Sequence, residues 1–92
     1  MLKINFKKMF TKIRYKKNKT YYVSLDKIKI QKCFLRTAIG KRKWGYKLNY
    51  YFTTGKLQSE IVLNHDFVLV DGYSSYLIAK KYGHKKVKVR FE

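Results

Sequence analysis

Hydrophobic and polar residues alternate in two segments of the chain with the two-residue period of a β-strand. Residues 21–25 form the first segment, and Asp26 interrupts it before Ile28 and Ile30 continue in an extended form. Residues 86–91 form the second, with hydrophobic residues directed inward and basic residues outward. Both segments are therefore predicted to be strands that place one face on a hydrophobic core.

Two further hydrophobic runs, residues 60–64 and 67–71, are joined by Asn64-His65-Asp66. A short polar connection of this kind typically links antiparallel strands, so the pattern predicts a β-hairpin.

Helical spacing replaces the alternation in the middle of the chain. Trp44, Leu48, Tyr51 and Phe52 recur every three or four residues, which predicts a helix with its apolar side on the core and its end at Gly55. Just before this helix, the basic run Lys41-Arg42-Lys43 follows Gly40 and is predicted to be an exposed loop.

A second helix is predicted over residues 72–82, with Asp71 as its cap and Gly83 at its end. The strands and helices together predict an α+β domain, in which helices pack against a small mixed β-sheet.

The first twenty residues differ in composition from the rest, because they hold many basic residues and no acid. Their hydrophobic residues recur at spacings of three and four, which favours an amphipathic basic helix, although a strand also fits part of the pattern. Such an arm suits nucleic acid or an anionic lipid surface, and the alternative is a helix whose apolar stripe packs on the core. We therefore divide the chain into an N-terminal arm or helix, residues 1–20, and a domain, residues 21–92.

Charge is the property that says most about function. The 92 residues carry 23 Lys and Arg against five Asp and Glu, a formal net charge of +18. Such a chain repels itself, and binding to phosphates relieves the repulsion and releases counterions. A genome-wide preference for lysine is the alternative, but it would raise the number of acidic residues as well.

The expected phosphate contacts are the basic residues of the arm, of the run after Gly40 and of the last strand. They are Lys7, Lys8, Lys12, Arg14, Lys16, Lys17, Lys41, Arg42, Lys43, Lys86, Lys88 and Arg90. Aromatic residues are interleaved with several of these cations, which suits stacking with bases of single-stranded nucleic acid, unless rings such as that of Trp44 belong to the core.

Several other chemistries are not expected. Cys33 is the single cysteine, which fits a cytoplasmic protein and cannot form a zinc site with the scattered His65 and His84. The few acids are not clustered as a metal-dependent nuclease requires. No hydrophobic run is long enough for a membrane span or a signal peptide. We therefore expect no metal, no cofactor and no enzyme activity.

The start of the helix predicted over residues 72–82 is a candidate anion pocket. Gly72 permits a close approach of the backbone, free N–H groups face outward there, and the hydroxyls of Ser74 and Ser75 add donors. The alternative is that the carboxylate of Asp71 occupies this position itself.

The same region resembles the ParB/sulfiredoxin-like superfamily, whose pattern runs through a strand, a G-x-x-R turn, a helix, a glycine and a V-x-V strand. The matching segments are Val70-Asp71-Gly72-Tyr73-Ser74-Ser75, Ile78-Ala79, Tyr82-Gly83 and Val87-Lys88-Val89. Upstream, Val23-Ser24-Leu25-Asp26-Lys27-Ile28, Phe34-Leu35-Arg36, Gly55-Lys56-Leu57 and Ile61-Val62-Leu63 are similar to the family's opening strand and its approach to the hairpin. The resemblance spans residues 21–91.

The resemblance implies the family's fold and a possible phosphate contact at Arg36. In nucleotide-binding members the arginine of the G-x-x-R turn holds phosphate, whereas Ser75 stands at that position here and lacks the charged fork of arginine. Sulfiredoxins carry a cysteine beside this turn, and Tyr73 and Ser74 stand there instead. The resemblance therefore does not imply sulfinate reduction.

Three functions remain open from the sequence. The first is a non-catalytic domain that binds DNA or RNA through the phosphate backbone with low sequence specificity. The second is a small inhibitor or accessory protein from a phage or mobile element, an anti-CRISPR protein for example, that acts on a host nucleoprotein. The third is a degenerate nucleotide-binding domain.

Overall fold

The computed structural model describes residues 14–36 and 38–92. Most of the predicted basic arm, including Lys7, Lys8 and Lys12, lies outside these residues. The division of the chain at residue 20 therefore stays a prediction.

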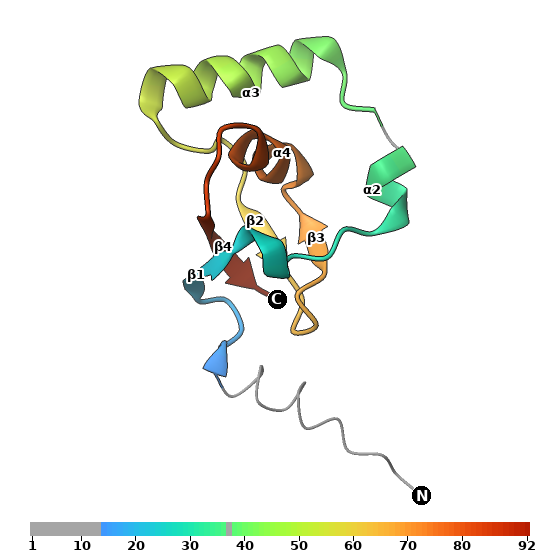
Figure 1. The fold of residues 1–92 in the computed structure, drawn as a ribbon, viewed down its shortest axis with the longest axis vertical. Coiled ribbons are helices and arrows are strands. Elements are labelled where there is room, and N and C mark those ends of the chain that lie inside the picture. Colours follow the sequence, from blue (N-terminus) through green and yellow to red (C-terminus); the bar gives the residue numbers. More distant parts are fainter. Residues whose placement is uncertain (1–13, 37) are drawn as a thin grey trace, which may run out of the picture.

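The strands form one four-stranded sheet in the order β1-β4-β2-β3. Its strands are β1 (Thr20–Ser24), β2 (Ile61–Leu63), β3 (Leu69–Asp71) and β4 (Lys86–Phe91). The strand pair β1–β4 is antiparallel, β2–β4 is parallel and β2–β3 is antiparallel. This confirms the prediction of a small mixed sheet in an α+β domain (Figure 1).

Alternation in β4 follows the predicted pattern. Val87, Val89 and Phe91 are buried, with Val89 and Phe91 at 0% exposure, while Lys86 and Lys88 between them are exposed. Val23 of β1 pairs with Val87 and belongs to the same core. The period of two therefore places the core on one face of the β1–β4 pair.

The predicted hairpin is also present, as β2 and β3. The side-chain oxygen of Asn64 accepts hydrogen bonds from the backbone N–H groups of Asp66, at 2.9 Å, and Val68, at 3.1 Å. Phe67 adopts a positive φ of 60° in this turn, which is unusual for a residue with a side chain. The polar connection therefore closes the hairpin through its own side chain.

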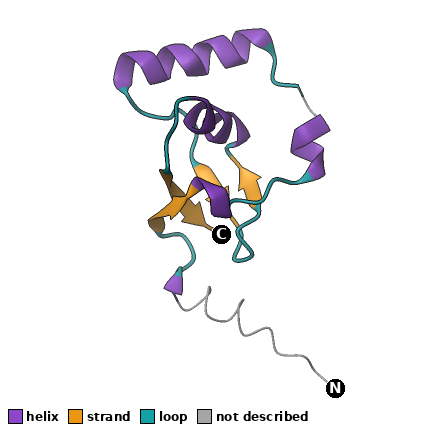
Figure 2. Cartoon of the chain, viewed as in Figure 1, coloured by secondary structure: helices purple, strands orange, loops and turns teal. Residues whose placement is uncertain are grey.

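The helices are α2 (Lys32–Arg36), α3 (Lys41–Thr54) and α4 (Tyr73–Lys81), with the short 3-10 helix η1 (Leu25–Lys27). In Figure 1, α4 lies between the sheet and α3, and α2 stands to one side. Figure 2 shows α3 and α4 on the same side of the strands. Among the described residues, no helix is long and apolar enough to cross a membrane.

The prediction of a basic loop at residues 41–43 is wrong. Helix α3 begins at Lys41, with Gly40 as its N-cap, so the three cations form the first helical turn. Gly40 provides no side-chain cap, which is why the usual sequence signal for a helix start is missing.

The prediction that α3 turns its apolar side to the core is only partly correct. The helix ends at Gly55 as expected, with φ 73° and its N–H bonded to the carbonyl of Tyr51 at 2.8 Å. However, α3 has no buried residue, and Phe52 is 62% exposed. The reason is that α3 contacts mainly α4 and does not reach the sheet.

The N-cap residue of helix α4 differs from the predicted one. Gly72, rather than Asp71, is the N-cap residue, and no side chain caps the helix. Asp71 ends β3, and its carboxylate accepts the N–H of Gly72 at 2.8 Å. The strand thus continues one residue too far for Asp71 to reach the helical N–H groups.

The extended segment predicted around Ile28 and Ile30 does not become a full strand. Lys29 makes an isolated parallel bridge to Val68, beside β3. Helix α2, which follows, was not expected from the sequence pattern.

Candidate phosphate-binding surface

The turn into α4 is tightly packed against the residues before β2. Gly72 has φ 86°, and a Cβ atom there would lie 2.3 Å from the carbonyl oxygen of Glu60. Two constraints therefore require glycine at this position, the positive φ and the close backbone contact.

The hydroxyl of Ser75 is used inside the protein. It donates to the carbonyl oxygen of Ser59 at 2.7 Å and accepts the N–H of Ser59 at 3.2 Å, and the residue is only 1% exposed. Ser75 therefore joins α4 to the segment before β2 and does not face the solvent.

Lys47 of α3 reaches this region from the other side. Its ammonium donates to the hydroxyl of Ser59 at 2.6 Å and to the hydroxyl of Ser74 at 2.7 Å. Sequence reasoning did not select Lys47. Its place between Trp44 and Leu48, on the apolar side of the helix, was the one available signal that it points inward.

The pKa of Lys47 is lowered from its ordinary value. Partial burial is the main cause, since it removes water from the ammonium, and the positive charge of Lys43 acts in the same direction. The carboxylate of Asp71 acts against these two effects. The surroundings of Lys47 in the folded protein therefore disfavour its charged form.

The predicted anion pocket of Gly72, Ser74 and Ser75 stays a prediction. The structure brings Lys47 to it and turns the hydroxyl of Ser75 away from it. Any anion bound here would meet Lys47 and Ser74 rather than Ser75.

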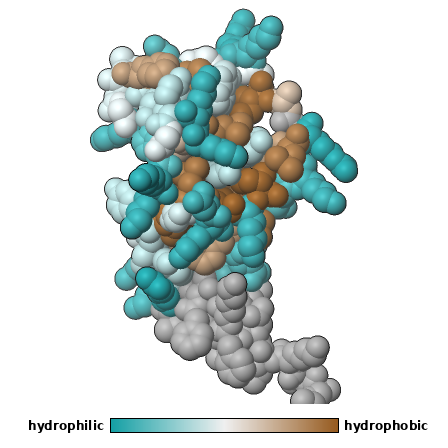
Figure 3. Space-filling model, in the orientation of Figure 1, coloured by the Kyte–Doolittle hydropathy of each residue, from teal (hydrophilic) through white to brown (hydrophobic). Residues whose placement is uncertain are grey.

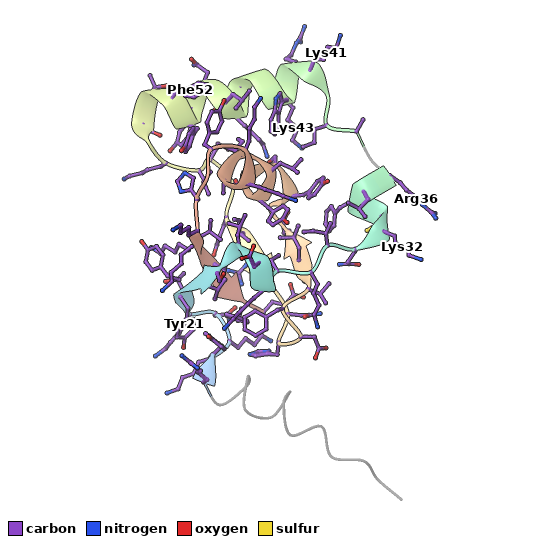
Figure 4. The ribbon with its side chains drawn as sticks, viewed as in Figure 1. Tyr21, Lys32, Arg36, Lys41, Lys43 and Phe52 are labelled. Atoms are coloured by element: carbon purple, nitrogen blue, oxygen red, sulfur yellow. The ribbon has the colours of Figure 1, made fainter. Side chains whose placement is uncertain are left out.

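Most of the expected phosphate contacts lie on the surface. Lys41, Arg42 and Lys43 are exposed in the first turn of α3. In Figure 4 the side chain of Lys41 points outward from α3, and Arg36, at the end of α2, also projects away from the body of the protein. These cations are accessible to a large anionic partner.

The basic residues of β4 are not all equivalent. Lys86 and Lys88 are exposed, whereas Arg90 is half-buried. The Nε of Arg90 lies 2.8 Å from Oε1 of Glu60, and its Nη1 donates to Asn18 at 3.1 Å. Arg90 is therefore occupied by protein groups, while its two neighbours are directed to solvent.

Residues before β1 carry further exposed cations. Arg14, Lys16 and Lys17 are all exposed, and the guanidinium of Arg14 lies 5.5 Å from the centre of the Tyr15 ring. Tyr15 itself packs on Phe91, with ring centres 4.6 Å apart, so this segment is attached to the core.

Most basic side chains of the described residues are exposed. Every Lys and Arg in the described part of the chain is exposed except Lys47 and Arg90, which are half-buried. Among these residues, the one ion pair between described side chains is that of Arg90 and Glu60. These exposed side chains are therefore accessible from solvent.

A cavity of about 310 Å³ lies beside α3 and α4. Ala38, Ile39, Trp44, Tyr73 and Leu77 line it, and none of these is charged. On the side of the molecule that Figure 3 shows, hydrophobic residues lie near the centre and hydrophilic residues surround them. The cavity does not suit a phosphate.

Comparison with solved structures identifies the fold. A structure of a pNOB8-like ParB N-domain has a TM-score of 0.67 and 23% identity, and covers 80% of this chain and 29% of that chain. A second pNOB8-like ParB N-domain structure has a TM-score of 0.64 and 26% identity, and covers 79% and 26%. The C-terminally truncated chromosome-partitioning protein ParB from Caulobacter crescentus, complexed with CTP-γ-S, has a TM-score of 0.61 and 12% identity, and covers 80% and 44%.

The chain therefore has a ParB-like N-domain fold, as the sequence resemblance implied. It corresponds to less than half of each of these chains. No protein-family model matches the sequence, and no curated protein matches it.

Proposed function

We propose that this protein binds nucleic acid through the phosphate backbone, with low sequence specificity and without catalysis. The observation that carries the proposal is the exposure of nearly all described cations on a chain with a net charge of +18. Binding of such a surface to phosphates is driven by the release of condensed counterions.

The first turn of α3 supports the proposal independently. Lys41, Arg42 and Lys43 lie at the positive end of the helix dipole, and no acid accompanies them in that turn. Cations there lower the stability of the helix, since the N-terminal N–H groups already carry positive partial charge. A bound phosphate backbone offsets this cost.

The positions of the exposed cations support low sequence specificity. The exposed cations lie on strands, on helix termini and in connecting segments, and sequence is read through contacts with base edges in a groove. Phosphate contacts alone position a protein on nucleic acid without selecting a sequence.

A second candidate function is nucleotide binding at the start of α4. It is supported by the half-buried ammonium of Lys47, held between two serine hydroxyls beside Gly72. The related ParB from Caulobacter crescentus is complexed with CTP-γ-S. Calorimetric titration with CTP and ATP tests this candidate, and an absence of heat at millimolar nucleotide contradicts it.

The first function is tested by comparing charge variants in a binding assay. Fluorescence anisotropy with labelled DNA and RNA is measured for the wild type and for Lys86→Gln/Lys88→Gln. We expect the variant to bind both probes more weakly and its affinity to depend less on salt, because two phosphate contacts are lost. Equal affinity of variant and wild type for both probes at low salt would count against these contacts.

A further inference from the structure

The outer face of the β1–β4 pair is open to solvent. Residues paired directly across antiparallel strands share a face, and here Tyr22 pairs with Lys88 while Ser24 pairs with Lys86. The opposite face of the same strands carries the core residues Val23 and Val87. An aromatic ring and two ammonium groups therefore lie together on the uncovered side of the sheet.

Tyr22 is unusually accessible for an aromatic residue in a strand. It is 71% exposed, and among the described residues its side chain makes no ring contact and no hydrogen bond. Its neighbour Tyr21 behaves differently, since that ring packs against Tyr15 at 5.1 Å and against Phe91 at 5.9 Å. The backbone of β1 therefore holds Tyr22 in place while its ring remains free.

Within residues 14–36 and 38–92, neither Lys86 nor Lys88 forms an ion pair or a side-chain hydrogen bond. Lys86 and Lys88 are two residues apart on one strand, so their ammonium groups stand on the same face and repel each other. Glu60, whose carboxylate contacts this strand, forms its ion pair with Arg90. An anion beside Tyr22 would relieve this repulsion.

We propose that this face binds a single strand of DNA or RNA, with one base stacked on Tyr22 and the adjoining phosphates at Lys86 and Lys88. The inference rests on the proposed nucleic-acid binding and adds a preference for single strands. Aromatic side chains stack on any base, but the bases of a duplex are already stacked on one another and do not offer their faces. Two lysines two residues apart along a strand suit successive phosphates of an extended chain.

Two other exposed aromatic residues differ from Tyr22 in their surroundings. Phe52 rests against Tyr51 and Tyr82, with ring centres 5.8 and 5.3 Å away, so its ring is partly used within the protein.

Tyr46 is 60% exposed on α3 and stands one helical turn after Arg42 and Lys43, so it is the exposed tyrosine whose surroundings most resemble those of Tyr22. Its cations lie on a helix, which rises only about 1.5 Å per residue, rather than along an extended strand. Replacement of Tyr46 therefore tests whether stacking is specific to the strand face.

The test measures binding of a labelled oligothymidylate of about 12 nucleotides and of a duplex of the same length. Tyr22→Thr keeps strand propensity and removes the ring. We expect it to weaken single-strand binding by about tenfold, from the loss of one stacked base, and to leave duplex binding and the salt dependence unchanged. Tyr22→Phe retains single-strand affinity, and Tyr46→Thr changes it by less than about twofold.

Each other result is decisive. If the wild type binds with steep salt dependence but Tyr22→Thr has no effect, the stacking inference fails and backbone binding stands. If the wild type binds neither probe at low salt, both fail. If Tyr22→Thr changes the oligomeric state in sedimentation without a selective loss of single-strand affinity, the face is a contact between two copies of the chain and the inference is overturned.

Discussion

At the start of α4, contacts with the segment before β2 restrict which residues fit at two positions. Ser75 and Gly72 both act on the segment before β2, Ser75 through its hydroxyl and Gly72 through the absence of a side chain. The sequence pattern predicted both residues at the start of a helix. It could not show that the hydroxyl of Ser75 accepts a hydrogen bond from the N–H of Ser59, sixteen positions away. A contact at that separation depends on the tertiary fold.

Replacement of two glycines by alanine is expected to have opposite effects. Gly72→Ala forces a Cβ against the carbonyl of Glu60 at a positive φ, and we expect it to lower the free energy of unfolding by about 3 kcal/mol. Gly45→Ala, within α3 and with no atom within 4 Å of the new Cβ, should raise it by about 0.5–1 kcal/mol. Urea unfolding of both variants measures the difference, and a mild effect of Gly72→Ala would contradict the close packing.

Removal of the Ser75 hydroxyl should also destabilise the fold. Ser75→Ala deprives the carbonyl and the N–H of the half-buried Ser59 of the partner that the buried Ser75 supplies, which costs about 1–3 kcal/mol. Ser24→Ala is the control, because Ser24 is half-buried but its side chain makes no capping hydrogen bond to η1. The two variants are compared by urea unfolding, and equal stability would mean that Ser75 is not structurally required.

Among the elements, the strands were predicted more accurately than the helices. The alternation of Val87, Val89 and Phe91 with basic residues is a local pattern, and the strand follows it. The start of helix α3 lacks the usual local signals, because three cations stand in its first turn and Gly40 offers no side-chain oxygen as a cap. The helical spacing of Lys47 indicates which side of α3 it occupies, but its hydrogen bond to Ser74 depends on the packing of α3 on α4, which no local pattern specifies.

The cations in the first turn of α3 should lower the stability of the fold. Lys41→Gln/Arg42→Gln removes two charges from the positive end of a helix dipole, and Lys80→Gln/Lys81→Gln removes two from the negative end of α4. Both variants lower the net charge equally, so we expect the first to be more stable than the second by about 1 kcal/mol. Thermal unfolding of the pair measures this, and the reverse order would contradict the dipole argument.

The lowered pKa of Lys47 has a consequence for stability against pH. When the folded-state pKa lies below that of the unfolded chain, the unfolded chain binds more protons between the two values, so stability rises with pH in that interval. The wild type should therefore gain stability relative to Lys47→Met as the pH rises toward the ordinary lysine value. Urea unfolding of both proteins across this range measures the gain, and a constant difference would mean that the pKa of Lys47 is unchanged by folding.

At the scale of the whole molecule, the total number of basic residues was a better guide to the candidate site than the choice of individual residues. The excess of Lys and Arg favours an anionic partner, and the described Lys and Arg side chains other than Lys47 and Arg90 are exposed. What the sequence could not show is which cations are engaged. Arg90 stays a predicted phosphate contact, but it pairs with Glu60 in the structure. Tyr22, which was not selected, stands exposed beside Lys88.

The most direct test of the central claim is the dependence of nucleic-acid affinity on salt. Dissociation constants for labelled DNA and RNA are measured by anisotropy over a range of salt concentrations. With about six phosphate contacts, the logarithm of the association constant should fall against the logarithm of salt with a slope of about −4 for single strands and about −5 for duplex DNA. A flat plot, or no binding to either polymer in dilute buffer, would contradict the claim that this cationic surface binds the phosphates of nucleic acid.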